Sequence, residues 1–220
     1  MPTCCSPFER ATEQQFNSKR AGEELARYRD KGPGPTTRSL LEGIRQWVPP
    51  GNGLLLDVGS GIGSLAFELL KNGGVSRAVG VDASPAYIDA AVEEAQRRGC
   101  ANLVQFVRGD FVAVSGELPR ATIVTLDRVV CCYPSFERLL GAALGHAERC
   151  VALSYPREAW YVRATLMLEN AGRAVHRNPF RTFVHSAAHM RELIAHAGFH
   201  LVSRRETWVW CSDVYLRRNA

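Results

Sequence analysis

Three glycines at alternate positions follow a short apolar run, and they constrain this chain more than any other feature. The run Leu54–Val58 leads into Gly59-Ser60-Gly61-Ile62-Gly63, and leucines then recur at helical spacing at positions 65, 69 and 70. This order predicts a buried strand, a tight glycine loop and a helix. Glycines in such a loop allow a sharp turn, close contact between ligand and backbone, and close packing of the helix on the strand. The loop is therefore a candidate ligand-binding element.

An acidic residue at the end of the next apolar run indicates what kind of ligand this is. Val79-Gly80-Val81-Asp82 predicts a second strand, and Asp82 follows the glycine loop by about 20 residues. In α/β folds that bind dinucleotides, a carboxylate at this distance accepts hydrogen bonds from ribose hydroxyls. An ionised carboxylate suits a diol because it accepts two hydrogen bonds and offers no competing donor. Together, the loop and Asp82 predict a nucleoside-cofactor site.

Strands and helices are expected to alternate after residue 53. The expected strands are 53–58, 78–82, 103–108, 122–127 and 150–154, and the helices between them are 64–72, 84–98 and 135–147. Alternating units of this length predict a parallel sheet covered by helices on both faces. A helix at 187–197 and strands at 199–202 and 207–216 are expected to complete the chain.

Helical patterns also precede the first strand. One helix is expected over residues 8–30, before a cluster of glycines and prolines, and a second is expected over 36–48. Thr36 or Thr37 is the expected cap of the second helix. We therefore divide the chain into an N-terminal helical lid, residues 1–35, and one domain, residues 36–220.

Composition limits the partners only broadly. The 220 residues carry a net charge of +5, mostly from arginine, which permits an anionic substrate or a nucleic acid without requiring either. No apolar run approaches the roughly 20 residues that span a bilayer, and the N-terminus lacks the pattern of a signal peptide. We therefore expect a cytoplasmic protein without a membrane span, whose seven cysteines are reduced thiols.

Acidic residues end or follow four successive expected strands. They are Asp57, Asp82, Asp110 in Gly109-Asp110-Phe111, and Asp127 in Leu126-Asp127. With the glycine loop, they make the chain resemble the class I S-adenosylmethionine (SAM)-dependent methyltransferases over most of residues 36–216. The resemblance implies an α/β fold: a Rossmann-like, doubly wound, mostly parallel seven-stranded sheet with helices on both faces and an antiparallel last strand. It also implies SAM as the cofactor and S-adenosylhomocysteine (SAH) as the product.

The resemblance implies a role for each cofactor-binding residue. The loop residues Gly59, Ser60, Gly61 and Gly63, with Asp57 before them, are expected against the methionine and ribose parts of SAM. Asp82 and Ala83 are expected at the ribose, Gly109, Asp110 and Phe111 at the adenine, and Asp127 on the side of the transferred methyl group. Asp57, Asp110 and Asp127 also fit structural roles in the loop, in a turn and as a cap. No metal ligands are expected. A nicotinamide cofactor fits less well, because the third glycine comes one residue earlier than in Gly-x-Gly-x-x-Gly.

A closer resemblance concerns the acceptor. The run from Leu126 to Tyr133-Pro134 is similar to the corresponding segment of magnesium-protoporphyrin O-methyltransferases, and Leu153–Arg157, Trp160-Tyr161 and Val184-His185 follow that family's order. This implies methylation of a carboxylate on a tetrapyrrole. Cys132 stands where that family has a histidine, and one extra residue follows Asp127, so the acceptor stays open.

An insertion, residues 157–185, is expected to form the acceptor site together with the segment Asp127–Pro134 and the N-terminal helix. Within it, Trp160, Tyr161, Met167 and Phe180 are expected to form an apolar platform. The expected rim consists of His176 and the arginines at 128, 157, 163, 173, 177 and 181, which suits an acceptor that is planar and carries carboxylates. The candidate catalytic residues are Tyr133 and Tyr28, although each also fits a packing role.

Two other functional classes remain open at this point. Methylation of RNA fits the net charge, although no RNA-binding module is recognisable beside the predicted domain, so nucleic acid is the less expected partner. A cofactor-binding protein without catalysis fits the same motifs. The expected partner is a small molecule, anionic or planar.

Overall fold

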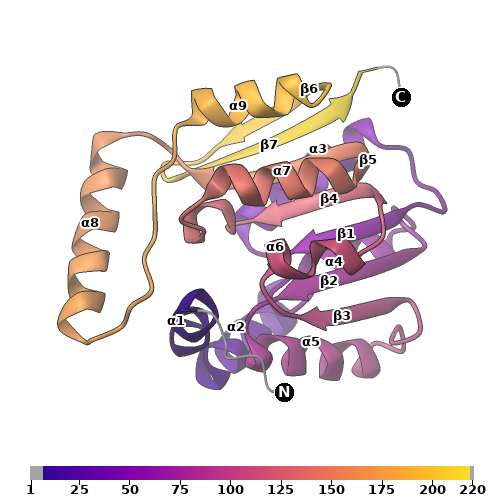
Figure 1. The fold of residues 1–220 in the computed structure, drawn as a ribbon. Helices are drawn as coiled ribbons and strands as arrows, with labels where there is room; N and C mark the ends of the chain where they lie inside the picture. Colours follow the sequence, from indigo (N-terminus) through magenta and orange to yellow (C-terminus); the bar gives the residue numbers. More distant parts are fainter. Residues whose placement is uncertain (1–6, 219–220) are drawn as a thin grey trace.

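The strand β1 (Leu54–Val58) lies inside a seven-stranded sheet (Figure 1). The structure is a computed structural model that describes residues 7–218. The neighbours of β1 are β2 (Arg77–Asp82) and β4 (Ala121–Asp127), and the full strand order is β3-β2-β1-β4-β5-β7-β6. The remaining strands are β3 (Val104–Arg108), β5 (Ala147–Pro156), β6 (Phe199–Glu206) and β7 (Trp210–Arg217), of which β3 and β6 form the edges of the sheet. Only β7 runs antiparallel to the others, so the predicted fold class is confirmed.

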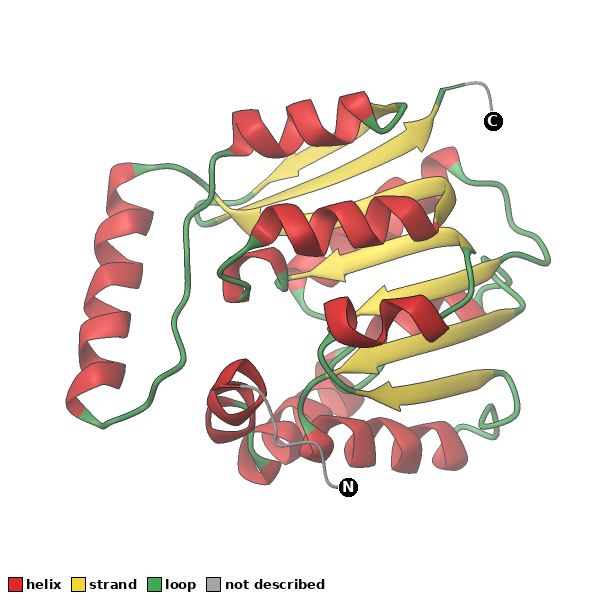
Figure 2. Cartoon of the chain, viewed as in Figure 1, coloured by secondary structure: helices red, strands yellow, loops and turns green. Residues whose placement is uncertain are grey.

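Helices cover both faces of this sheet (Figure 2). On one face lie α3 (Pro35–Trp47), α4 (Ser64–Lys71) and α5 (Pro85–Arg97), and on the other lie α6 (Phe111–Val114), α7 (Phe136–His146) and α9 (Ala187–His196). Alternate residues of β1 pack against different faces, because side chains of a strand point to opposite sides. Leu55 belongs to the core beneath α3 and α4, whereas Leu56 and Val58 belong to the core beneath α7.

The N-terminal segment differs from the prediction of one helix over 8–30. It forms α1 (Pro7–Gln15) and α2 (Ser18–Lys31), and residues 1–6 of the predicted lid lie outside the described residues. The break occurs at Asn17, whose backbone is extended and whose side chain accepts a hydrogen bond from the N–H of Arg20, so Asn17 caps α2. The expected cap of α3 was also wrong. Gly34 holds that position, and the two threonines lie in the first turn.

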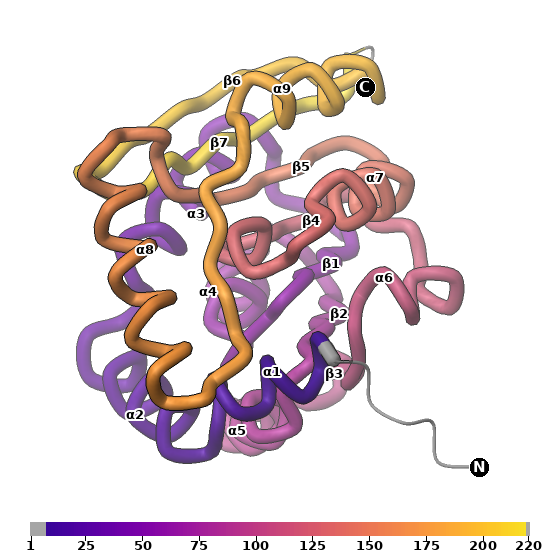
Figure 3. The backbone as a smooth tube through the Cα atoms, turned by 60° about the vertical axis from the view of Figure 1, so that its left-hand side comes forward, coloured from indigo at the N-terminus to yellow at the C-terminus, as the bar shows by residue number. Residues whose placement is uncertain are grey.

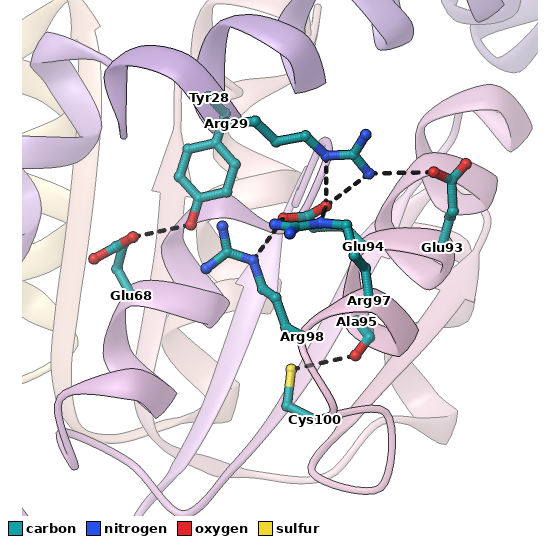
Figure 4. A network of polar contacts seen from close by, with 9 residues as sticks. All are labelled: Tyr28, Arg29, Glu68, Glu93, Glu94, Ala95, Arg97, Arg98 and Cys100. Atoms are coloured by element: carbon teal, nitrogen blue, oxygen red, sulfur yellow. Dashed lines mark hydrogen bonds and ion pairs between the residues drawn. The ribbon is translucent and has the colours of Figure 1, made fainter.

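A buried carboxylate fastens α2 to the domain (Figure 4). Glu94 of α5 is fully buried and accepts hydrogen bonds from Arg29 of α2 and from Arg97 and Arg98. The hydrogen bonds from Arg97, followed by those from the other two arginines, lower the pKa of Glu94 to about 2 despite its burial. The N-terminal helices are therefore anchored to the sheet domain by charge-assisted hydrogen bonds.

The insertion after β5 stands apart from the sheet. It contains α8 (Trp160–Val175), which lies at the margin of the molecule, and residues 176–186 run back beside it towards α9 (Figure 1, Figure 3). Short 3-10 turns, η1 (Ser115–Glu117) and η2 (Val130–Cys132), complete the described elements. Among residues 7–218, no helix is both long enough and apolar enough to cross a membrane.

Candidate functional site

A cavity of about 500 Å³ opens at the carboxyl ends of β1, β2, β3 and β4. Its other walls come from α1, α2, η2, one face of α8 and the turn between β6 and β7. The predicted site residues in its wall are Gly59, Gly61, Asp82, Ala83, Gly109, Asp110, Phe111, Asp127 and Tyr133. Asp57, Ser60, Gly63 and Tyr28 are not in the wall. The position is the switch point of the sheet, where α/β proteins bind ligands, and the volume is typical of a small-molecule site.

The glycine loop needs its glycines for two different reasons. Gly59 has φ +65°, and a Cβ atom there would overlap the adjacent side chain of Val129, which also lines the cavity. Gly63 has φ +80°, and a Cβ atom there would lie 2.9 Å from both Phe67 and Phe106. Gly59 therefore allows the loop to lie directly against Val129 in the cavity wall, and Gly63 allows helix α4 to pack on the sheet.

Asp82 is held by the backbone at the end of β2. Its Oδ2 accepts a hydrogen bond from the N–H of Gly61 at 2.9 Å, and its Oδ1 accepts one from the N–H of Ser84 at 2.8 Å. Burial raises the pKa of Asp82 to about 6, although these two hydrogen bonds oppose the shift. The carboxylate is thus oriented by the loop, and each oxygen keeps capacity to accept a further hydrogen bond.

Two of the predicted residues lie behind the cavity wall. Asp57 is buried and accepts a 2.6 Å hydrogen bond from the hydroxyl of Thr125 on the adjacent strand, and burial raises its pKa to about 7. Ser60 is also buried, and its Oγ is the one side-chain polar atom in the described chain that is buried without a partner. Asp57 therefore joins β1 to β4.

Asp110 and Tyr133 meet at the adenine side of the predicted site. Asp110 caps α6 by accepting from the N–H of Val112, and its Oδ2 accepts a 3.0 Å hydrogen bond from the hydroxyl of Tyr133. Burial and the neighbouring Asp110 carboxylate raise the pKa of Tyr133 above its usual value. Tyr133 is therefore a poor proton acceptor, and in this arrangement it orients Asp110.

Asp127 is fixed by two hydroxyl groups that sequence reasoning missed. Its Oδ2 accepts from Thr37 of α3 and its Oδ1 from Ser154 of β5, each at 2.6 Å. Ser154 also accepts from the N–H of Arg128, which has φ +61°. These partners lie far from Asp127 in the sequence, so no local signal could have identified them.

Arg128 joins the segment after β4 to the N-terminal helices. Its guanidinium is 3.1 Å from a carboxylate oxygen of Glu24 on α2, and Glu24 also accepts a hydrogen bond from the hydroxyl of Tyr87. Glu24 and Arg128 both line the cavity. They form a charged bridge across it that was not predicted.

Tyr28 lies elsewhere, which removes it from the catalytic candidates. Its ring is buried under the guanidinium of Arg98, and its hydroxyl donates to Glu68 of α4 at 2.9 Å (Figure 4). This is the packing role that the sequence left open for it. Tyr28 therefore joins α2 to α4 and does not contribute to the cavity wall.

The insertion faces the cavity with a different set of residues than expected. Tyr161 and Phe180 line it, but Trp160 and Met167 are exposed, with 80% and 71% of their surface accessible. Most of the expected arginine rim is paired within the protein. Arg157, Arg163 and Arg173 pair with Glu206, Glu158 and Glu169, and Arg181 donates to backbone carbonyls. The predicted platform and rim are therefore only partly present.

Comparison with known proteins bears directly on this site. Residues 55–152 match the family described as a methyltransferase domain. This region holds the glycine loop, Asp82, Asp110 and Asp127, so the predicted resemblance is confirmed for the part of the chain that lines the cofactor side of the cavity. A search among curated proteins found no match.

Several solved structures share this fold. Magnesium protoporphyrin IX methyltransferase (ChlM) from Synechocystis PCC 6803 with bound SAH is 19% identical, with a TM-score of 0.70 over 94% of this chain and 98% of that one. An O-methyltransferase family protein from Burkholderia thailandensis is 16% identical, with a TM-score of 0.69 over 94% of this chain and 63% of that one. The [4+2]-cyclase SpnF is 12% identical, with a TM-score of 0.70 over 97% of each chain. At these identities, the likeness shows a shared fold.

Proposed function

We propose that this protein is a SAM-dependent methyltransferase acting on a small-molecule acceptor. The observation that carries the proposal is the grouping of the glycine loop, Asp82 and Asp110 along one side of a single cavity. Asp82 offers acceptors to a ribose diol and Asp110 offers one to an adenine amino group. When bound, SAM supplies a methyl group that is already activated on a sulfonium. The residues present therefore fit this cofactor.

The charge of the cavity also suits SAM. Its lining includes the carboxylates of Glu24, Asp82, Asp110, Asp127 and Glu169, against the guanidinium groups of Arg20, Arg128 and Arg173. SAM carries a sulfonium, an ammonium and one carboxylate, so a lining with excess negative charge stabilises it. The same excess disfavours the phosphate backbone of RNA, which binds through uncompensated cations.

The chain's own contribution is to align the two reactants and to exclude water. Tyr133 is not a suitable general base, because its raised pKa and its hydrogen bond to Asp110 keep its proton in place. An acceptor that needs no base fits best. A carboxylate is such an acceptor, since it is ionised at neutral pH.

The rest of the cavity supports an apolar acceptor that carries an acid. Aromatic and aliphatic side chains from α1, the turn after it, α8 and the loop after α8 line it, namely Phe8, Phe16, Leu166 and Phe180. Arg20 lines it as well, and its guanidinium has no partner among residues 7–218. We therefore propose an O-methyltransferase for a carboxylate on a planar, apolar molecule, of which a magnesium porphyrin is one example.

The first experiment separates this function from its alternatives. The protein is incubated with methyl-labelled SAM and a panel of porphyrins, aromatic acids, phenols and RNA. Transfer to a carboxylic acid is expected, as a base-labile ester. Label in RNA alone would favour an RNA methyltransferase. Binding of SAM without any transfer would favour a protein that binds the cofactor but does not transfer methyl groups.

A second experiment tests the cofactor site. Asp82→Ala should weaken SAH binding by about 2–3 kcal/mol in calorimetry, because two hydroxyls lose a charged acceptor. Asp89→Ala is the matched control, since Asp89 is exposed on α5 and does not line the cavity. Equal affinity in the two variants would contradict the role of Asp82.

A third experiment tests the acceptor class through Arg20. Arg20→Ala should raise the KM of a carboxylate acceptor about tenfold and leave SAH affinity within a few-fold. The adjacent Lys19→Ala is the control, because Lys19 is exposed and outside the cavity wall. A loss of SAH affinity without a change in acceptor KM would instead place the carboxylate of SAM at Arg20.

A further inference from the structure

The outer face of α8 is apolar and uncovered. Trp160, Met167, Leu168 and Val175 are each between 71% and 80% exposed. In Figure 1 and Figure 3, α8 lies at the edge of the molecule. These four side chains expose on the order of 500 Å² of apolar surface, which is at the upper end for the largest patch of a monomer.

The exposed residues form one continuous stripe. Trp160, Ala164, Met167, Leu168, Ala171 and Val175 are spaced by three, four or one residue, which places them on one side of a helix, and all six are exposed. The residues of α8 that line the cavity lie on the opposite side; they are Tyr161, Val162, Thr165, Leu166, Glu169 and Arg173. The helix therefore has a mixed polar and apolar side that lines the cavity and an apolar side that is exposed.

We propose that this stripe binds the same stripe on a second copy of the chain, with the two α8 helices antiparallel about a two-fold axis. In such a contact, if residue i lies opposite residue j, then j lies opposite i. The stripe meets this condition about a centre between Met167 and Leu168. Trp160 then lies opposite Val175 of the copy, Ala164 opposite Ala171, and Met167 opposite Leu168.

The sizes of these residues favour close packing. On each side of the centre a small alanine meets a small alanine, which lets the helix axes approach to the lower part of the usual range of about 8–10 Å. At each end the largest residue, Trp160, meets the medium-sized Val175, so large side chains do not collide. The pairing thus alternates bulky and small layers, as interdigitating helices require.

The available area matches a stable contact. A standard interface buries about 800 Å² on each partner. Homodimer interfaces are about 65% apolar, so the roughly 500 Å² of apolar surface on the stripe is about the amount that each partner needs. Because the inner side of α8 lines the cavity, pairing of the outer sides would also hold that cavity wall in place.

Analytical ultracentrifugation of the full chain at micromolar concentrations tests the proposal. The native protein should be a dimer. The double variant Met167→Glu/Leu168→Glu should be a monomer, because like charges then meet at the axis. The control Ala188→Glu/Ala195→Glu adds the same charges to exposed positions of α9 and should stay dimeric. Circular dichroism checks that each variant is folded.

A steric substitution tests the register. Ala164→Trp should weaken the dimer severalfold, because Ala164 meets Ala171 of the copy where the two helices approach most closely. A native monomer, or a dimer that the α8 variants do not weaken, would overturn the proposal. A native monomer that floats with phosphatidylserine vesicles, and that loses this binding in the Met167→Glu/Leu168→Glu variant, would overturn it as well and would assign the stripe to a membrane surface.

Discussion

The hydroxyl of Tyr133 donates a 3.0 Å hydrogen bond to Asp110, the carboxylate expected at the adenine of SAM. Tyr133 comes from the segment after β4, and Asp110 follows β3, so the contact joins two loops at the carboxyl edge of the sheet. Tyr133 is also packed edge-on against Phe8 of α1 at a centroid distance of 4.8 Å. The sequence places Tyr133 at the acceptor, whereas in the structure its hydroxyl contacts a residue that is expected at the cofactor.

Tyr133→Phe should lower SAH affinity about fivefold and should leave the pH dependence of methyl transfer unchanged. The variant loses one hydrogen bond, worth about 1 kcal/mol, but retains the ring that packs against Phe8. Calorimetry gives the affinity for SAH, and single-turnover rates at several pH values give the pH dependence of methyl transfer. A large loss of rate at full cofactor saturation, with affinity unchanged, would restore a direct catalytic role for the hydroxyl.

The affinity for SAM should fall as the pH is lowered through about 6. Burial raises the pKa of Asp82 to about 6 in the ligand-free protein, and the ribose hydroxyls need the ionised carboxylate as an acceptor. Protonation below that pH removes one acceptor site and the negative charge. Calorimetric titrations between pH 5 and 8 measure the effect. In Asp82→Asn the affinity for SAM should be weaker throughout and nearly independent of pH. If the affinity of this variant changed with pH as steeply as that of the native protein, the pH dependence would belong to another group.

Asp57→Asn should stabilise the protein at pH 8 and have less effect at pH 5. The pKa of the buried Asp57 carboxyl is raised to about 7 in the folded state, so folded Asp57 binds a proton more strongly than the unfolded chain does. Its contribution to stability is therefore present at low pH and is lost as the pH rises from about 4 through 7. The asparagine keeps an acceptor for Thr125 without the charge. Urea unfolding should show a gain of about 2 kcal/mol at pH 8. An equal change at both pH values would contradict this account.

Glu94→Gln should destabilise the protein and loosen α2. The side chain is fully buried and loses its charge, while three arginines lose their shared partner, so the cost should be about 2 kcal/mol. Because the pKa of Glu94 is lowered to about 2, this contribution is present at neutral pH and is lost as the pH falls from about 4.5 towards 2.

Two measurements check the Glu94 prediction. Urea unfolding gives the stability, and hydrogen exchange of α2 gives its local opening. Glu93→Gln is the matched control, because Glu93 precedes it on α5 and contacts Arg29 but is 68% exposed. SAH affinity should also fall in Glu94→Gln, since α2 forms part of the cavity wall. Equal losses of stability in Glu94→Gln and Glu93→Gln would contradict the prediction, because they would show that the burial of Glu94 adds nothing to the stability of the fold.

The amphipathic pattern of α8 shows where sequence reasoning fails for a physical reason. Trp160 and Met167 were expected to face the acceptor because large apolar side chains usually face a core. A helical period identifies which residues share a side, but it does not say which side is covered. On α8 the cavity-facing side carries Tyr161 and Thr165, and the more apolar side is exposed. The break at Asn17, by contrast, had a local signal, since asparagine is a preferred cap.

By itself the sequence determined the order of strands and helices, the glycine loop, and the positions of Asp82, Asp110 and Asp127 at strand ends. These follow from short-range patterns, because strand and helix periods and glycine conformations depend on neighbouring residues. Only the tertiary structure decided which side chains meet. Thr37 reaches Asp127, Tyr133 reaches Asp110, and Arg29 reaches Glu94 across long stretches of chain. Such contacts depend on how whole elements pack, and the same local pattern is compatible with many partners.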